Sequence, residues 1–365
     1  MTKRALYLTY RPSQLDDIVG QKYVVGTLKQ ASNKDMFAHA YLFSGNHGCG
    51  KTSSARILAT LLNCENVSKG VLCGKCRACK TIPLGTSSDV KELDGATNRG
   101  IDDIKSLIES AQYSPQELKK KVYIIDEVHQ LTKEATSALL KILEEPPSYL
   151  TFILCTTEIK KILPTILSRC QRFNFNKISS KDIAERLKHI ADNEDINVSE
   201  DGCLLIGRIS RGSMRDAVGY LDQIATLAQN KQITAQHIEK FFGVINRKAI
   251  LNIIEAMKSK NLTLILDQVN DFIMAGVNAK TILTELSQVF RDIMILKIPN
   301  VNMNLVDLPD SEVEELKKIA ESLKASHLIK LSKIFGDIER QIGYNINERW
   351  IMEATLLNCV SIINS

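Results

Sequence analysis

The chain has 365 residues, of which 24% are charged and 44% hydrophobic, and 47 basic against 42 acidic side chains give a formal net charge of +5. This length predicts two or three domains with buried cores, and the mild basic excess permits a nucleic-acid partner without requiring one. The first residues lack the apolar core of a signal peptide, no apolar run is long enough to span a membrane, and the cysteine count of nine is odd, so we expect a soluble cytoplasmic protein with no membrane partner.

The first motif along the chain is a complete phosphate loop, Gly-x-x-x-x-Gly-Lys-Thr, at residues 45–52. It follows a predicted strand at 40–44 and precedes a predicted helix at 52–62. In such a loop successive backbone N–H groups surround a phosphate, Lys51 reaches the outer phosphates, and the Thr52 hydroxyl binds Mg²⁺. The alternative is a simple glycine turn, and the flanking strand and helix favour the phosphate site.

Four cysteines follow with the spacing C-x8-C-x2-C-x2-C, namely Cys64, Cys73, Cys76 and Cys79. Turns of the C-x2-C type place thiolates on one side of a tight backbone knuckle, and four thiolates complete a tetrahedron around Zn²⁺. With four protein ligands, the zinc would be structural. An iron–sulfur cluster and four unrelated reduced cysteines are the alternatives. The remaining cysteines are predicted to be small core or loop residues: Cys49, Cys155, Cys170, Cys203 and Cys359.

A second nucleotide motif lies at residues 121–129, where an apolar run ends in Asp126 and Glu127. This pattern predicts a buried parallel strand with two acids at its carboxyl end, the edge at which open α/β sheets bind ligands. Asp126 is therefore predicted to join Thr52 around Mg²⁺, and Glu127 to be the base that orients an attacking water. A strand ending in solvated acids is the alternative, and the preceding phosphate loop favours a nucleotide site.

Alternating strands and helices predict a parallel sheet in the first part of the chain. Strands are expected near 40–44, 89–94, 121–126, 150–156 and 171–175, and a helix at 134–144 that ends before Pro146. From about residue 179 the sequence predicts helices only.

The first predicted caps are Ser180, Ser213 and Thr234, and a helix opened by Thr234 ends at Gly243. Longer amphipathic helices are expected near 262–275, 279–298, 311–323, 326–342 and 347–363. A bundle without a catalytic constellation is predicted to be a scaffold or an assembly surface.

Further short motifs point to a family. They are Tyr10-Arg11-Pro12, Asp17-Ile18-Val19-Gly20-Gln21, Leu143-Glu144-Glu145-Pro146-Pro147, Cys155-Thr156-Thr157, Ser168-Arg169-Cys170, Gly212-Ser213-Met214-Arg215-Asp216-Ala217 and Glu353-Ala354-Thr355-Leu356-Leu357. With these, the chain from about residue 7 to its end resembles the gamma/tau family, the ATPase subunits of the bacterial DNA polymerase III clamp loader. The Ser-Arg-Cys motif together with the zinc insertion is highly specific to that family.

The resemblance implies an α/β AAA+ P-loop ATPase domain at residues 1–178, with a parallel sheet covered by helices on both faces and a zinc-knuckle insertion at about 64–79. A small helical lid at 179–242 and an all-α collar at 243–365 would follow. The implied function is that of the ATP-hydrolysing motor subunit of a five-membered ring. With ATP and Mg²⁺ it would open the sliding clamp and load it on primer–template DNA during chromosome replication, within the holoenzyme of a DNA-directed DNA polymerase.

The resemblance also implies residue roles. Thr157 matches the sensor-1 residue, Arg215 the sensor-2 arginine, and Arg169 an arginine finger that acts in trans on a neighbouring subunit's nucleotide. A guanidinium is always charged and offers several donors to phosphate oxygens, which suits both arginines. The implied nucleotide contacts are Arg11, Val19, Gly45, Asn46, His47, Gly48, Cys49, Gly50, Lys51, Thr52, Ser53, Met214 and Arg215. Candidates for DNA phosphate contacts are Lys141 and the basic residues around Arg99 and Lys105.

The sequence departs from the family pattern at Pro164, which stands one place later than expected and could re-aim the loop leading to Arg169. No segment of the sequence corresponds to the extra domains of the longer tau form. Two alternatives are consistent with this: a natural short form, or part of a longer chain. A DNA-remodelling AAA+ motor such as a branch-migration helicase is a rival, but that class should lack the zinc knuckle. A scaffold that binds ATP without hydrolysing it is another, but it would typically lose Lys51 or the acids.

Overall fold

The computed structural model describes the chain except for residues 1–4, 229–231, 302–304, 307, 309 and 342–346. The chain forms two compact units, Met1–Ile233 and Thr234–Ser365. These two units do not separate an ATPase domain from a lid, and their boundary follows Ile233. The three-part division at residues 178 and 242 therefore remains a prediction. Among the described residues, no helix is both long enough and apolar enough to cross a membrane.

The first unit contains a five-stranded, fully parallel sheet in the order β2-β3-β4-β1-β5. Its strands are β1 (Ala40–Gly45), β2 (Val90–Asp94), β3 (Lys121–Asp126), β4 (Leu150–Thr156) and β5 (Gln171–Phe175), which confirms all five predicted strands. Ser44 pairs with Thr156, and Asp94 with Asp126, so the carboxyl ends of these strands share one edge. Because β4 lies between β1 and β3, the residue after β4 falls between the phosphate loop and the two acids.

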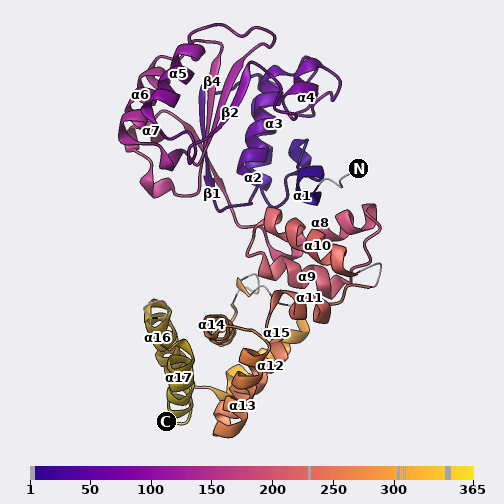
Figure 1. The fold of residues 1–365 in the computed structure, drawn as a ribbon, viewed down its shortest axis with the longest axis vertical. Coiled ribbons are helices and arrows are strands. Elements are labelled where there is room, and N and C mark those ends of the chain that lie inside the picture. Colours follow the sequence, from indigo (N-terminus) through magenta and orange to yellow (C-terminus); the bar gives the residue numbers. More distant parts are fainter. Residues whose placement is uncertain (1–4, 229–231, 302–304, 307, 309, 342–346) are drawn as a thin grey trace. The chain divides into compact units, whose positions relative to one another are not determined.

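Helices cover both faces of this sheet (Figure 1). Phe43, Ile124 and Ile153 pack on one face with α2 (Lys22–Lys34) and α3 (Lys51–Asn63). Leu42, Ile125 and Leu154 pack on the other with α5 (Ile101–Ala111), α6 (Lys133–Glu144) and α7 (Pro164–Leu167). Successive strand side chains point to opposite faces, so the short apolar runs in the sequence are buried on both sides.

Two short helices complete the first part of this unit, α1 (Leu6–Thr9) and α4 (Arg77–Thr81), and three longer ones follow the sheet: α8 (Ser180–Asn193), α9 (Glu200–Ile209) and α10 (Met214–Ala228). The predicted cap Ser180 is wrong by one residue. Ser179 is extended and its Oγ accepts from Asp182 N, whereas Ser180 is already helical and buried. The cap at Ser213 is confirmed, since its Oγ accepts from Asp216 N at 3.3 Å.

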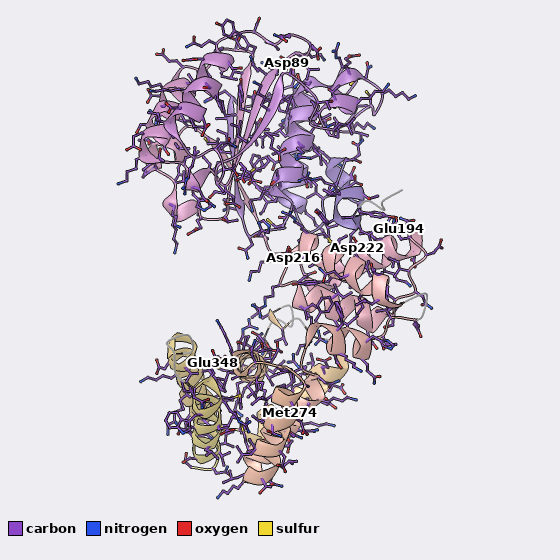
Figure 2. The ribbon with its side chains drawn as sticks, in the orientation of Figure 1. Asp89, Glu194, Asp216, Asp222, Met274 and Glu348 are labelled. Carbon is purple, nitrogen blue, oxygen red and sulfur yellow. The ribbon has the colours of Figure 1, made fainter. Side chains whose placement is uncertain are left out.

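Helix α10 also contacts the start of the chain. Asp222, labelled in Figure 2, accepts a hydrogen bond from Leu6 N at 3.1 Å, and α1 packs on α10. The chain's first helix is therefore held against the helix that carries Met214 and Arg215.

All named secondary-structure elements in the described part of the second unit are helices. Its helices are α11 (Ala235–Phe242), α12 (Arg247–Lys258), α13 (Leu262–Met274), α14 (Ala279–Leu296), α15 (Asp310–Ser322), α16 (Ala325–Gln341) and α17 (Glu348–Ile363). Thr234 caps α11, and Gly243 ends it in the left-handed conformation, as predicted. Helix α12 was not predicted. Asn246 caps it, and its isoleucines enter one apolar core shared with the longer helices.

Candidate nucleotide site and cysteine cluster

The phosphate loop connects β1 to α3 and depends on its glycines. Gly48 lies at φ +70°, and a Cβ there would collide with the Ser213 side chain. Gly50, at φ +102°, is the N-cap of α3. Both positions have a backbone conformation that favours glycine, and at Gly48 the Ser213 side chain also leaves no room for a Cβ. The loop thus leads directly into the N-terminus of α3, where unpaired N–H groups favour an anion.

Lys51 and the predicted magnesium ligands lie together at this loop. The Lys51 side chain is buried, and its Nζ donates to Gly45 O and Asn46 O at 2.8 Å each. Thr52 Oγ1 donates to Asp126 Oδ2 at 2.6 Å. A hydroxyl and a carboxylate in contact offer the oxygen ligands that Mg²⁺ prefers, so the residues present fit this ion. The phosphate loop and the strand that ends in Asp126 therefore meet in the structure, as expected from the sequence.

The second acid, Glu127, faces the end of β4. Its Oε2 accepts from Thr157 Oγ1 at 2.9 Å and from Thr157 N at 3.3 Å. His129 Nδ1 lies 3.3 Å from the same oxygen. The structure therefore brings the predicted base and the predicted sensor-1 residue into direct contact.

A pocket of about 490 Å³ opens beside the phosphate loop. Its walls come from the amino-terminal segment, the loop itself, the ends of β2 and β3, and helices α8 and α10. The predicted nucleotide contacts among its lining residues are Arg11, Val19, His47, Gly48, Cys49, Gly50, Lys51, Thr52, Ser53, Met214 and Arg215. Of the other two, Asn46 lines a neighbouring hollow, and Gly45 contributes the carbonyl that Lys51 contacts.

Two arginines approach this pocket from different elements. Arg11 Nε donates to Ser53 Oγ at 3.4 Å, and burial lowers the pKa of its guanidinium, which nonetheless stays charged near neutral pH. Arg215 lies with Cζ 5.5 Å from the centre of the Tyr7 ring and Nη1 3.5 Å from His47 Nε2. Met214 N donates to Gly48 O at 3.0 Å, which ties α10 to the phosphate loop.

Tyr7, Arg186 and His129 also lie at the site and were not predicted from the sequence. Tyr7 and Arg186 line the pocket, and His129 contacts Glu127. Tyr7 lies three residues before the Tyr10-Arg11-Pro12 motif, and His129 is the last residue of the motif that contains both acids. Their closeness to these motifs could have indicated that they lie at the site. Arg186 is one of several charged residues on α8, and nothing local distinguishes it.

Arg169 lies on the segment after α7. Among the described residues its contacts are with α6 and its own segment: Nη2 lies 2.5 Å from Glu144 Oε1, and Nη1 donates to Thr165 O at 2.8 Å. Pro164 occupies the first turn of α7, where its missing N–H costs nothing. The guanidinium is about one-third exposed. Its role in trans remains a prediction.

The candidate DNA contacts are exposed. Lys141 lies on α6, Lys105 on α5, and Arg99 just before α5, and helices α5 and α6 pack together. Exposure permits contact with phosphates but is usual for such side chains, so these residues stay predictions.

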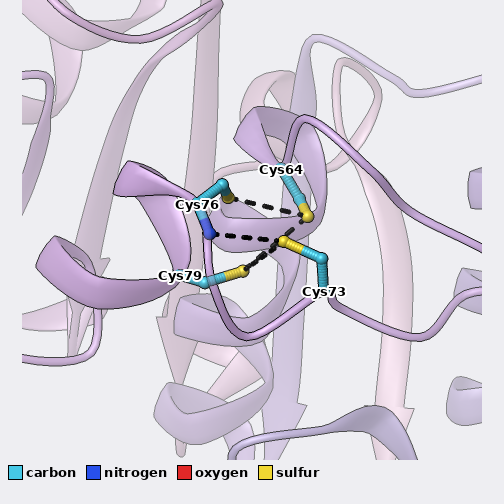
Figure 3. Close-up of side chains that lie close together, drawn as sticks. All are labelled: Cys64, Cys73, Cys76 and Cys79. Carbon is cyan, nitrogen blue, oxygen red and sulfur yellow. Dashed lines mark hydrogen bonds between the residues drawn. The ribbon is translucent and has the colours of Figure 1, made fainter.

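The four predicted zinc ligands form one cluster (Figure 3). The Sγ atom of Cys64 lies 3.9 Å from that of Cys76 and 3.7 Å from that of Cys79, and the Sγ atoms of Cys73 and Cys79 are 3.9 Å apart. A zinc–sulfur distance of about 2.3 Å gives a tetrahedron edge of about 3.8 Å, so the thiols fit this ion. Backbone N–H groups of Lys75 and Cys76 lower the pKa of Cys73 to about 6, which favours its thiolate.

Three family profiles match consecutive parts of the chain. "DNA polymerase III, delta subunit" matches residues 20–179, "DNA polymerase III clamp loader subunit, ATPase lid domain" matches 182–230, and "DNA polymerase III subunits gamma and tau domain III" matches 233–364. Among solved structures, a variant of Thermotoga maritima RuvB is 18% identical with a TM-score of 0.50, covering 84% of this chain and 98% of that one. At this identity the likeness shows a shared AAA+ fold alone.

Curated relatives are more similar in sequence. DNA polymerase III subunit tau of Bacillus subtilis is 35% identical, covering 98% of this chain and 63% of that protein. Subunit gamma/tau of Mycoplasma genitalium is 38% identical, covering 82% and 50%, so the chain spans only about half to two thirds of these relatives. Subunit gamma of Buchnera aphidicola is 32% identical and is covered over 99% of its length. With relatives at this identity matched almost end to end, the chain belongs to the gamma/tau family of DNA polymerase III clamp-loader subunits.

Proposed function

We propose that this chain is the ATP-hydrolysing motor subunit of a bacterial clamp loader. One observation carries the proposal: at a single edge of the sheet, Lys51 lies in the phosphate loop, Thr52 contacts Asp126, and Glu127 contacts Thr157. Lys51, Thr52 and both acids are all present, so the set needed for hydrolysis is complete. This favours a motor over a scaffold that only binds ATP.

Each residue has a distinct task in the proposed reaction. The loop N–H groups and Lys51 bind the phosphates, and Thr52 and Asp126 hold Mg²⁺, which supplies charge neutralisation when bound. Glu127 accepts a proton from the attacking water and orients its lone pair toward phosphorus. Thr157 donates to Glu127 in the structure. Arg215 and, from a neighbouring subunit, Arg169 stabilise the charge on the transferring phosphoryl group.

The assembly belongs to the same proposal. Residues 1–178 would be the ATPase domain, 179–242 the lid, and 243–365 the collar that builds a five-membered ring with other clamp-loader subunits. The ring would open the sliding clamp and release it on primer–template DNA. Polymerase catalysis is not part of this, because the matched families describe a clamp-loader ATPase subunit; assigning the polymerase class to this subunit is not supported.

ATPase activity measured with and without primed DNA and the sliding clamp tests the function. We expect stimulation by both together in the assembled loader. Stimulation by a four-way DNA junction but not by the clamp would instead favour a branch-migration motor. Tight ATP binding without turnover in the complete loader would favour the scaffold.

Lys51→Ala is expected to weaken ATP binding by about ten- to a hundredfold, because a buried ammonium that contacts phosphate is removed. Calorimetric titration with Mg·ATP measures this directly. Lys34→Ala, at the exposed end of α2, is the matched control and should bind normally. Unchanged affinity in Lys51→Ala would mean that the triphosphate lies elsewhere.

The purified protein is expected to hold one Zn²⁺ through Cys64, Cys73, Cys76 and Cys79. Elemental analysis measures the stoichiometry, and Cys64→Ser should lose the metal while Cys170→Ser, outside the cluster, should keep it. Because the cysteine cluster lies apart from the residues that line the nucleotide pocket, ATP affinity should change less than local order. An iron–sulfur absorption band, or metal-free protein, would contradict the prediction.

A further inference from the structure

His129 is a buried side chain that the proposed reaction does not yet use. Only 6% of it is exposed. Its Nδ1 lies 3.0 Å from Thr156 Oγ1 and 3.3 Å from Glu127 Oε2, and its Nε2 lies 3.4 Å from Glu158 Oε1. Polar partners on both nitrogens hold the ring in one plane, and burial between β4 and the turn after β3 keeps it there.

Glu127 is a residue whose orientation needs support. Its backbone lies at φ +47°, in the left-handed region that residues with side chains rarely adopt. Within the described part of the chain, the contacts of its carboxylate all fall on Oε2, from Thr157 Oγ1, Thr157 N and His129 Nδ1. Two hydrogen bonds from Thr157 and a close imidazole nitrogen on one oxygen restrict the plane of the carboxylate, so that Oε1 can be directed toward a water.

We propose that His129 is a positioning residue for ATP hydrolysis, whose Nδ1–H holds Oε2 of Glu127 and thereby aims the carboxylate at the attacking water. The inference rests on the proposed function, in which Glu127 is the base. His129 lines a hollow with Glu127, Thr157 and Glu158, and it is not among the described residues that line the nucleotide pocket, which Glu127 reaches. Its loss should therefore slow turnover and spare ATP affinity.

The contacts of the two ring nitrogens of His129 differ in strength. Glu158 is half-exposed and forms an ion pair with Lys161 at 2.8 Å, which lowers the pKa of Glu158 and already satisfies its carboxylate. The Nε2 contact is therefore weak. The Nδ1 side faces the buried Thr156 and the less exposed Glu127. The effect of His129 should thus depend on a donor at the Nδ1 position.

Two substitutions distinguish the role of Nδ1 from that of Nε2. The amide nitrogen of His129→Asn falls near Nδ1, and that of His129→Gln falls near Nε2. In the assembled loader we expect His129→Gln to lower kcat by about ten- to a hundredfold, by analogy with the loss when residues that orient metal ligands are removed. His129→Asn should restore a large part of that loss. KM and ATP affinity should be unchanged in both, and His189→Gln, an exposed histidine on α8, is the control.

A double variant distinguishes failure of the inference from failure of the proposed function. If His129 acts only through Glu127, the Glu127→Gln/His129→Gln loader should be no slower than Glu127→Gln alone. Parent-like turnover in His129→Gln, with slow turnover in Glu127→Gln, would overturn the inference and leave the function standing. Equal losses in the Asn and Gln variants, with lowered melting temperatures, would show a structural role and overturn it too. Parent-like turnover in Glu127→Gln would instead refute the base assignment.

Discussion

In an assembled loader, Glu127→Gln should bind ATP with the parent affinity and hydrolyse it about 10²–10⁴ times more slowly, the usual contribution of a positioned general base. Glutamine keeps the shape of the side chain and an oxygen that can accept from Thr157, but it cannot take a proton from water. The predicted magnesium ligands Thr52 and Asp126 are untouched, which is why binding should survive.

Single-turnover hydrolysis and Mg·ATP titration, performed on the same preparations, separate these two effects. Glu134→Gln removes a charge from the exposed first turn of α6 and should behave as the parent. Comparison with Lys51→Ala is the most informative, because the two variants should fail at different steps. If both lost affinity to the same degree, the division between phosphate binding and water activation would be wrong.

Much of the fold could be predicted because its signals are local. The central strands are short apolar runs, and β3 and β4 have the predicted bounds because buried parallel strands are covered by apolar side chains on both faces. Helix α12 was not predicted although Asn246 caps it; its apolar side chains pack on the neighbouring α13 and on the later α14 and α17. The cap of α8 was predicted one residue late, at Ser180, because the two neighbouring serines are the same residue type; in the structure Ser179 accepts from Asp182 N and Ser180 is buried.

The candidate site likewise has a part that could be predicted from the sequence and a part that could not. Short local motifs predict Lys51, Thr52, Asp126 and the four cysteines as site residues, because the residues of each motif lie within one short segment. The contact between His129 and Glu127, and the approach of Tyr7 to Arg215, arise from elements that meet only after folding. Glu127 also adopts a left-handed backbone conformation, which could not be predicted because the residue at this position is neither glycine nor asparagine. Orientation within the site is therefore the part that needed the structure.

Arg169→Ala should leave ATP affinity nearly intact and abolish most of the turnover stimulated by DNA and clamp. An arginine supplied in trans accelerates the best-studied GTPases by about 10³–10⁵, and we expect a smaller factor here because Lys51, Mg²⁺ and Arg215 share the charge. In its own chain Arg169 contacts Glu144 and Thr165, a pairing that presents the guanidinium at the surface beside α6 and α7. Arg172→Ala, an exposed arginine three residues later, is the matched control.

Mixed rings test whether the arginine acts on a neighbour. A ring built only from Arg169→Ala subunits has intact pockets without fingers, and one built only from Lys51→Ala subunits has fingers without working pockets. When the two are combined, some Lys51→Ala subunits present an intact Arg169 to an intact pocket next to them, so part of the activity should return. An arginine that served its own pocket could not be complemented in this way, because each pocket would still lack either its lysine or its arginine. Absence of any recovery in rings verified to contain both subunits, or full-rate hydrolysis by a verified monomer, would therefore exclude a finger in trans.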